Sequence, residues 1–280
     1  MNYKIVVDSS GEFTKEEMDK LNIVKVPLHI SVLGHDFTDD ETMDVPKLLT
    51  LMKASKEIPK TACPSPQSYY EAIEGDEKDV YIITLSAELS GSYNSACMAK
   101  ELFEEDNGTD KKIHVINSKS ASVAQSLIAF TIASLYTTGQ KFDDVVAKIA
   151  AFISEQRTFF VLDNLQNLSR SGRLPAMITK LLDMINIKVF CEGNSEGKIN
   201  LAGFDRGLDK AVNKMVERIS NEAKDITDKI MLISYCNCLQ RAIELKDKIL
   251  KKCNFQEIRL YEMGGLSSTY ADDGGLIVTF

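Results

Sequence analysis

The sequence predicts an α/β protein of two domains, and three observations carry this prediction. The chain has 280 residues, which is too many for one ordinary core. Strand-like and helix-like segments alternate through its first half, as in a mostly parallel sheet flanked by helices. In the second half, two strand-like runs flank a turn rich in Gly, Asn and Ser, which is typical of a β-hairpin. We expect a first domain over residues 1–157 and a second α/β domain over residues 158–280.

The first half opens with an apolar strand at 4–7, followed by Thr14-Lys15-Glu16-Glu17. That pattern is a capping box, in which a Thr hydroxyl and a Glu carboxylate satisfy free amides at a helix start. The helix at 121–137 is apolar on most of its faces, so we expect it in the core. The other expected segments are strands at 23–30, 80–85 and 112–116, and helices at 45–54, 65–73, 90–103 and 142–155.

The second half is expected to combine a hairpin with further strands and helices. The hairpin turn is Glu192-Gly193-Asn194-Ser195-Glu196-Gly197, between strands at 187–191 and 198–202. The remaining strands are expected at 158–162, 230–234, 257–261 and 276–279, and the helices at 164–169, 176–184, 208–223 and 239–253.

Charge and hydropathy exclude several classes of protein. The net charge is 33 − 41 = −8, which would repel a phosphate backbone, so we expect no nucleic-acid partner. The longest mostly apolar stretch, 126–136, is about half of the roughly 20 residues that a membrane span needs. We therefore do not expect an integral membrane protein. Transient contact with a membrane surface is still compatible with this sequence. The chain begins on a strand rather than a signal peptide, and its six sparse cysteines suggest reduced thiols, so we expect a cytoplasmic location.

The cysteines and histidines do not predict a metal site. Cys236-Asn237-Cys238 lacks the paired spacing of zinc ligands, and we interpret it as a strand end leading into a helix. The three histidines, His29, His35 and His114, have no paired spacing to these thiols. We expect neither a metal nor a cofactor.

A hydroxyl-rich loop follows the predicted strand at 80–85 and includes Ser90-Gly91-Ser92. In open α/β sheets, ligands bind beyond the carboxyl ends of strands, where helix amino termini present free N–H groups. Serine hydroxyls there, with Gly91 allowing close approach, suit a carboxylate or a phosphate. Alternatively, Ser90 or Ser92 only caps the following helix. Both roles are compatible, because one hydroxyl can cap while its neighbour faces the ligand.

Two further loops carry groups that could contact a ligand. In Lys60-Thr61-Ala62-Cys63-Pro64-Ser65-Pro66, Ser65 is expected to cap a helix with Pro66 at its first position, which leaves Thr61 without a structural duty. In Ser169-Arg170-Ser171-Gly172-Arg173, two arginines form an exposed basic point on an acidic protein. They are either solvated surface charge or a contact for an anion or a partner.

Enzyme motifs receive little support. Ser90-Gly91-Ser92-Tyr93-Asn94 lacks the Gly-x-Ser-x-Gly frame of a nucleophile elbow, and no histidine lies in a motif that would supply a base. A Walker loop and a dinucleotide fingerprint are also missing from the sequence. A serine hydrolase using Ser90 or Ser92 and a carrier of another anionic small molecule, such as a phosphorylated metabolite, remain as alternatives.

Several ordered motifs resemble the DegV family along nearly the whole chain. They are Val6-Val7-Asp8-Ser9-Ser10, Val26-Pro27-Leu28, Thr61-Ala62-Cys63-Pro64-Ser65, the stretch from Leu85 to Ala96, Ser171-Gly172-Arg173-Leu174, and the segment from Leu182 to Val189. The stretch from Leu85 to Ala96 is close to that family's most specific motif.

The resemblance implies a lipid-binding protein that is not itself an enzyme. Such a protein binds one long-chain fatty acid, with the tail in an apolar tunnel chiefly in the second domain and the carboxylate at the interdomain cleft. In several members, the protein presents that carboxylate to a separate kinase subunit that forms an acyl-phosphate. Carried over by position, Thr61 and Ser90 would bind the carboxylate through hydroxyls, without a lysine or arginine beside it. Arg173 and Arg170 would be candidate contacts for the kinase.

The sequence departs from the family pattern near its end. Where the family usually has a His-Thr-Gly-Pro-Gly turn close to the carboxylate, this chain has Tyr270-Ala271-Asp272-Asp273-Gly274. Tyr270 can donate one hydrogen bond but cannot become a cation near neutral pH. Two aspartates near a carboxylate would repel it, so fatty acid binding is better supported by the sequence than phosphorylation of the bound acid.

Overall fold

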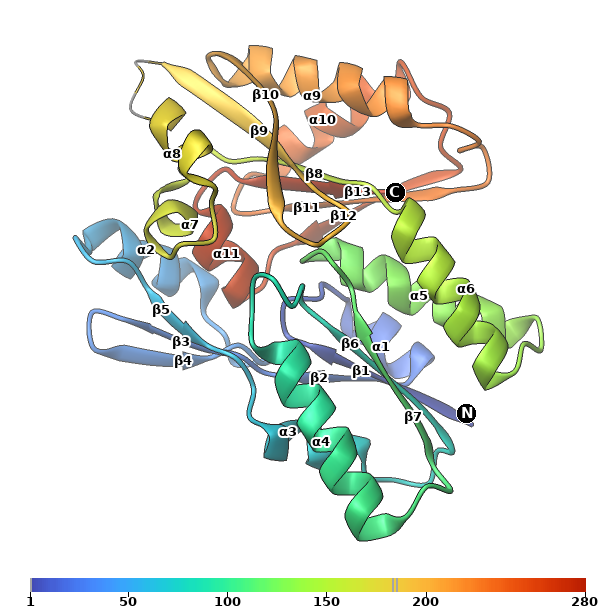
Figure 1. Cartoon of the computed structure of the whole chain (residues 1–280). Coiled ribbons are helices and arrows are strands. Elements are labelled where there is room, and N and C mark those ends of the chain that lie inside the picture. The colour runs from blue at the N-terminus through green and yellow to red at the C-terminus, as the bar shows by residue number, and fades with distance from the viewer. Residues whose placement is uncertain (1, 183, 185) are drawn as a thin grey trace.

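A computed structural model describes residues 2–182, 184 and 186–280 of the chain. It confirms the predicted α/β class, with a parallel sheet flanked by helices and a larger mixed sheet (Figure 1). Among the described residues, no helix is long and apolar enough to cross a membrane.

The first half is built on a four-stranded parallel sheet in the order β2-β1-β6-β7. Alternate residues face opposite sides: Ile5 and Tyr81 point to one core cluster, and Val6 and Ile82 to another. Both faces are therefore covered, as is usual for parallel sheets. The strands are β1 (Tyr3–Asp8), β2 (Ile23–Val26), β6 (Asp79–Thr84) and β7 (Lys112–Asn117).

Helices cover both faces of this sheet and begin where the sequence signals indicate. At the start of α1, the Thr14 hydroxyl accepts the Glu17 N–H at 3.2 Å, and the Glu17 carboxylate accepts the Thr14 N–H at 2.9 Å, which confirms the capping box. The cluster on one face includes residues of α3 and α4, and the cluster on the other face includes residues of α5 and α6. The bounds are α1 (Lys15–Leu21), α3 (Pro66–Ile73), α4 (Ser92–Asn107), α5 (Val123–Thr137) and α6 (Phe142–Glu155).

Helix α5 joins the two large sheets. One side of it packs on the parallel sheet through Ile128 and Ile132, and another side contacts the larger sheet through Val123 and Leu127. This double burial explains why the segment is apolar on most faces. It also means that α5, which precedes position 158, contributes to the core of both halves. The predicted domain boundary between residues 157 and 158 therefore stays a prediction.

A small antiparallel sheet of order β4-β3-β5 was not predicted. The segment expected as one strand at 23–30 is divided into β2 and β3 around Pro27, because proline has no N–H to donate to a ladder. The segment around Thr61, which was expected to be a loop, pairs as β5 with β3. The elements of this region are β3 (His29–Val32), β4 (His35–Thr38), β5 (Lys60–Ala62) and α2 (Val45–Ala54), the last with the predicted bounds.

The second half is built on a six-stranded sheet in the order β10-β9-β8-β13-β11-β12. Only β11 and β12 pair in parallel within it. The predicted hairpin is confirmed, and its turn places Gly197 at a φ of +91°, which favours glycine. The strands are β8 (Thr158–Val161), β9 (Ile187–Gly193), β10 (Ile199–Arg206), β11 (Ile230–Tyr235), β12 (Glu257–Glu262) and β13 (Leu276–Thr279).

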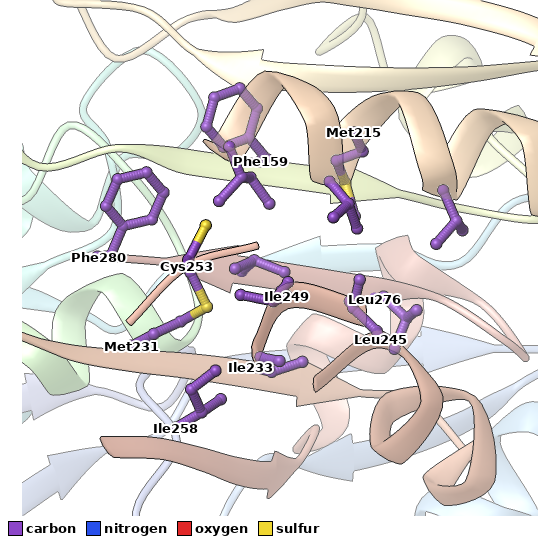
Figure 2. Packing of buried hydrophobic residues seen from close by; sticks show 14 of the residues in the cluster. Phe159, Met215, Met231, Ile233, Leu245, Ile249, Cys253, Ile258, Leu276 and Phe280 are labelled. Atoms are coloured by element: carbon purple, nitrogen blue, oxygen red, sulfur yellow. The ribbon is translucent and has the colours of Figure 1, made fainter. Parts of the chain in front are cut away.

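Helices α9 and α10 cover the face of the larger sheet that points away from the parallel sheet (Figure 1). Figure 2 shows the core between these helices and the sheet, where Phe159 and Met215 pack with Ile233, Ile249 and Leu276. The helices are α7 (Gln166–Arg170), α8 (Ala176–Leu182), α9 (Leu208–Glu222), α10 (Leu239–Leu250) and α11 (Gly265–Ala271). Helix α11 was not predicted, and position 183, within the expected helix at 176–184, lies outside the described residues.

Because α5 packs against both sheets, truncating its buried side chains should lower the free energy of unfolding substantially. Replacing the fully buried Ile128 with Ala should lower the free energy of unfolding by about 2–5 kcal/mol, through lost burial and the cavity left behind. Met98→Ala on α4, where the side chain is 53% exposed, is the control and should change it by less than about 1 kcal/mol. Equal losses for the two variants in urea denaturation would contradict the central position of α5.

Candidate ligand-binding site

A cavity of about 360 Å³ lies where the two halves meet. This size falls within the roughly 300–1,000 Å³ of typical small-molecule sites. Phe160 and Ile277 line it from the inner face of the larger sheet, while their neighbours Phe159 and Val278 point to the outer core. The other large apolar side chains of the wall are Leu28, Leu85, Leu89, Leu162, Leu168, Ile199 and Leu266.

A buried carboxylate at the end of β1 holds two residues of the cavity wall, Ser10 and Leu85. Asp8 accepts hydrogen bonds from the Leu85 N–H at 2.6 Å, the Ser10 hydroxyl at 2.8 Å and the Gln125 side-chain amide at 2.9 Å. Burial raises its pKa, and these hydrogen bonds act in the opposite direction. The carboxyl ends of β1 and β6 are thereby tied together, and the serine loop begins at this tie.

Ser90 lies on the cavity wall, half-buried, directly before α4. Its hydroxyl oxygen accepts the N–H of Ser92, the first residue of the helix, at 3.2 Å. Ser90 therefore satisfies the first amide of the helix and also borders the cavity, but the N-cap residue is Gly91 and no side chain caps α4. The loop lies against β5, because a Cβ added at Gly91 would stand 3.1 Å from the Cys63 sulfur.

Thr61 and Tyr270 meet at the same cavity. The Thr61 hydroxyl on β5 and the Tyr270 hydroxyl on α11 are 2.8 Å apart, although 209 positions separate them in the chain. Both side chains line the cavity and are half-buried. Ser65 performs the predicted capping role, accepting the Ser68 N–H at 3.1 Å, and so leaves Thr61 as the hydroxyl of this loop that faces the cavity.

The prediction that both arginines are exposed is wrong for Arg173. Its guanidinium donates to the Leu89 carbonyl at 3.0 Å and lies over the Tyr270 ring, 5.4 Å from the centroid, so the side chain is half-buried in the cavity wall. Arg173 therefore borders the same cavity as the hydroxyls, while the expectation that no lysine or arginine stands beside the bound carboxylate stays a prediction. Arg170 is exposed and donates to the Lys56 carbonyl at 3.4 Å in a separate polar groove.

The expected repulsion by two aspartates does not arise in this arrangement. Asp272 and Asp273 border the same polar groove as Arg170 rather than the cavity that Tyr270 lines. Asn164 donates to Asp272 at 2.8 Å, and Asn237 donates to Asp273 at 3.1 Å. The end of α11 thus directs Tyr270 inward and both carboxylates outward.

Two buried carboxylates that sequence reasoning missed hold the start of α11. Asp39 accepts the N–H groups of Gly265 at 2.7 Å and Leu266 at 3.0 Å, and Glu12 accepts the Gly264 N–H at 3.0 Å. Burial raises the pKa of Glu12 to about 7, while the charge of Lys25 acts in the opposite direction. No sequence motif predicts these contacts, because each carboxylate accepts from backbone amides more than 200 positions away in the chain.

The charges around the cavity favour an anion. Arg173, Lys119 and Lys198 line it, while the lining residues that the structure describes include no Asp, Glu or His. Within the described part of the chain, no three His, Cys, Asp or Glu side chains gather where they could hold a metal ion. The cavity therefore presents hydroxyl donors and cationic side chains beside an apolar wall, which suits a ligand with an anionic group and an apolar part.

Comparison with known proteins places the chain in a family. The family model described as an uncharacterised protein of the DegV family matches residues 2–280. The chain belongs to the DegV family. A DegV domain-containing protein of Streptococcus pneumoniae is 32% identical over 284 residues, which cover all of this chain and 99% of that protein.

Solved DegV structures share the whole fold. A DegV-family protein from Ruminococcus gnavus, refined with vaccenic acid, is 38% identical with a TM-score of 0.95, and the match covers all of both chains. One from Eubacterium eligens, loaded with heptadecanoic acid, is 27% identical with a TM-score of 0.91, covering 99% of this chain and 98% of that one. The fatty acid kinase B3 protein of Streptococcus pneumoniae, loaded with linoleic acid, is 30% identical with a TM-score of 0.89, covering all of this chain and 99% of that one.

The burial of Glu12 predicts a pH dependence of stability. Because its folded pKa is raised from 4.5 to about 7, the protonated form favours folding, and this contribution is complete below about pH 4.5 and lost as the pH rises towards 7. Relative to Glu12→Gln, the wild-type protein should therefore lose on the order of 3 kcal/mol of unfolding free energy over that range. Urea denaturation at several pH values measures it. Glu16→Gln, at an exposed position, is the control, and wild-type and Glu12→Gln curves that stay parallel would contradict the assignment.

Proposed function

We propose that this DegV-family protein binds one long-chain fatty acid at the cavity between its halves. The observation that carries the proposal is the convergence of Thr61, Ser90 and Tyr270 on one apolar cavity that has cationic and no acidic side chains among its described lining residues. The relatives solved with vaccenic, heptadecanoic and linoleic acid support it. The carboxylate is placed at the three hydroxyls, and the tail runs along the apolar wall towards the second domain.

Burial of the tail supplies most of the affinity in this proposal. At about 0.8 kcal/mol per buried CH₂, a chain of about fourteen methylenes offers on the order of 11 kcal/mol before the costs of binding. A charge-assisted hydrogen bond contributes roughly 1.5–3 kcal/mol. The apolar wall therefore sets how tightly the acid binds, and the hydroxyls set where its carboxylate lies.

We further propose that the bound acid is presented to a separate kinase subunit. The relationship to a fatty acid kinase B3 protein supports this role, in which the present chain carries the substrate and does not itself catalyse the reaction. Arg170 is exposed and offers the kinase a basic contact. Arg173, three positions further along the chain, lies over the Tyr270 ring in the cavity wall, beside the proposed carboxylate site.

The two alternatives fit the cavity less well. A serine hydrolase needs a base beside its nucleophile, and the described residues of the cavity wall provide no histidine. A carrier of a phosphorylated metabolite needs a polar cavity, whereas this wall is largely apolar. Labelling of Ser90 or Ser92 by a fluorophosphonate probe would favour the hydrolase.

Organic extraction of the purified protein, followed by mass spectrometry, tests the proposed ligand. We expect one fatty acid per chain, and exchange for added palmitate with an affinity in the nanomolar-to-micromolar range. A preparation that contains no lipid and also fails to bind added fatty acids would overturn the proposal.

The hydroxyl roles predict the effect of a double substitution. Thr61→Ala with Ser90→Ala removes two donors to the carboxylate and should weaken palmitate binding at least tenfold, at roughly 1.5–3 kcal/mol per bond. Because Ser90 also accepts the Ser92 N–H, the free energy of unfolding should fall by up to about 2 kcal/mol, which leaves the protein folded. Thr137→Ala with Ser154→Ala makes the same two changes at exposed positions and should leave binding unchanged. Isothermal titration of delipidated protein measures both, and unaltered affinity in the first variant would refute the roles of Thr61 and Ser90.

A further inference from the structure

The turn between β9 and β10 reaches from the larger sheet to the first half of the chain (Figure 1). The Ser86 hydroxyl, in the loop after β6, donates to the Gly197 carbonyl at 2.8 Å. A Cβ added at Gly197 would stand 3.1 Å from the Lys119 Cα, in the loop after β7, and closer still to the Ser86 hydroxyl oxygen. The turn is therefore seated tightly against both loops, at a φ of +91° that favours glycine.

This turn forms one wall of the cavity. Gly193, Gly197 and Lys198 line the cavity from residues 193–198. A further polar groove, of about 650 Å³, borders the same turn at Asn194 and Ser195. The turn therefore has the cavity on one side and an open groove beside it.

The cavity and this groove share part of their walls. Lys119, Ser120, Thr158 and Gly193 line both of them. The Ser120 and Thr158 hydroxyls lie 2.9 Å apart, so one layer of residues separates the two spaces. Moving the turn away from the first half would join the cavity to the groove.

The walls of the cavity differ in how firmly they are held. Strands β8 and β13 are interior strands of their sheet and pair on both sides, and the start of α11 is held by Asp39 and Glu12. Among the described residues, the turn at 193–198 makes two polar contacts with the first half. They are the Ser86–Gly197 hydrogen bond and an ion pair between Lys198 and Glu88 at 3.6 Å. The ion pair is exposed and contributes little, so the turn is the wall that moves at the lowest cost.

Ser86 connects this turn to the loop that carries Ser90. Its carbonyl accepts the N–H groups of Leu89 and Ser90, both at 3.0 Å, and its own N–H donates to the Ser120 carbonyl at 2.9 Å. The backbone of Ser86 thus supports the hydroxyl site, while its side chain holds the turn. Removing the side-chain hydroxyl alone separates these two roles.

We propose that the β9–β10 turn, residues 193–198, is the gate of the fatty acid cavity and that the Ser86–Gly197 hydrogen bond holds it closed. With the turn seated, it covers one side of the bound tail. With the turn lifted, the cavity opens into the groove at Asn194 and Ser195, and the acid can enter or leave. The gate rests on the proposed fatty acid function and deepens it, because it names the route of exchange. Segments that close over a ligand commonly limit its entry and release.

A gate affects the rates of binding more than the affinity. If the turn must lift before the acid enters or leaves, weakening its closed state raises the open fraction of the free and the loaded protein alike. Association and dissociation then accelerate together, and Kd stays almost constant. A residue that only holds the bound acid would instead change dissociation and Kd, with association unchanged.

Ser86→Ala tests the gate, because it removes the hydrogen bond to Gly197 and keeps the backbone groups that hold Ser90. Stopped-flow fluorescence with cis-parinarate, a fluorescent long-chain fatty acid, measures both rate constants. We expect each to rise about threefold to tenfold, with Kd within about twofold of the wild-type value.

Gly197→Ala acts on the same contact from the other side, because the added methyl group meets the Ser86 hydroxyl. It should raise both rate constants at least as much as Ser86→Ala. Gly139→Ala is the matched control, since Gly139 also has a positive φ, +75°, but no atom lies within 4 Å of an added Cβ. This control should leave both rate constants unchanged.

Each outcome of this experiment decides the proposal. Parallel acceleration of association and dissociation in Ser86→Ala supports the gate. Wild-type rates, or faster dissociation without faster association, overturn the gate and leave the fatty acid function standing. If Ser86→Ala fails to fold, Gly197→Ala decides by the same criteria. If the wild-type protein does not bind cis-parinarate at all, the proposed function and the gate both fail.

Discussion

The position of α11 depends on two carboxylates that the first half of the chain buries beneath it. Asp39 and Glu12 accept the free N–H groups at the start of this helix, which lies in the second half. Unpaired amides at a buried helix end are costly, so these contacts fix where α11 sits. Because α11 is short, fixing its start also fixes its end, where Tyr270 reaches Thr61 at 2.8 Å. The cavity is closed by the same contacts that join the two halves.

The protein is acidic, yet the lining of its cavity can accommodate an anion. The chain has a net charge of −8, yet its buried carboxylates are turned towards backbone amides and hydroxyls, and Asp272 and Asp273 face another groove. Arg173 remains at the cavity, where it lies over the Tyr270 ring. Tyr270 cannot itself carry a positive charge, but its ring contacts the Arg173 guanidinium, which does.

The sequence predicted most of the elements, because local signals determine them. That Thr61 and Ser90 lie at one site was instead expected from the family resemblance. Helices 45–54 and 142–155 have the predicted bounds, and the capping residues Thr14 and Ser65 act as expected. Strand β5 was missed because it has three residues and pairs only with a distant strand. The burial of Arg173 and the partners of Asp39 and Glu12 were missed for a related reason: they depend on contacts between segments far apart in the chain. Periodicity and capping signals report only on residues close together in the sequence. The cavity is formed by residues that are far apart in the sequence, so these signals do not predict its contacts.

The central claim is that hydroxyls from both halves hold one carboxylate at the mouth of an apolar cavity. A crystal structure of the protein purified with its lipid tests this most directly, because head-group contacts and tail path are seen together. The account predicts elongated density along Phe160 and Ile277, ending in a carboxylate within hydrogen-bonding distance of Thr61 and Ser90. Density with the carboxylate at the opposite end of the cavity, or a lipid bound outside it, would contradict the account.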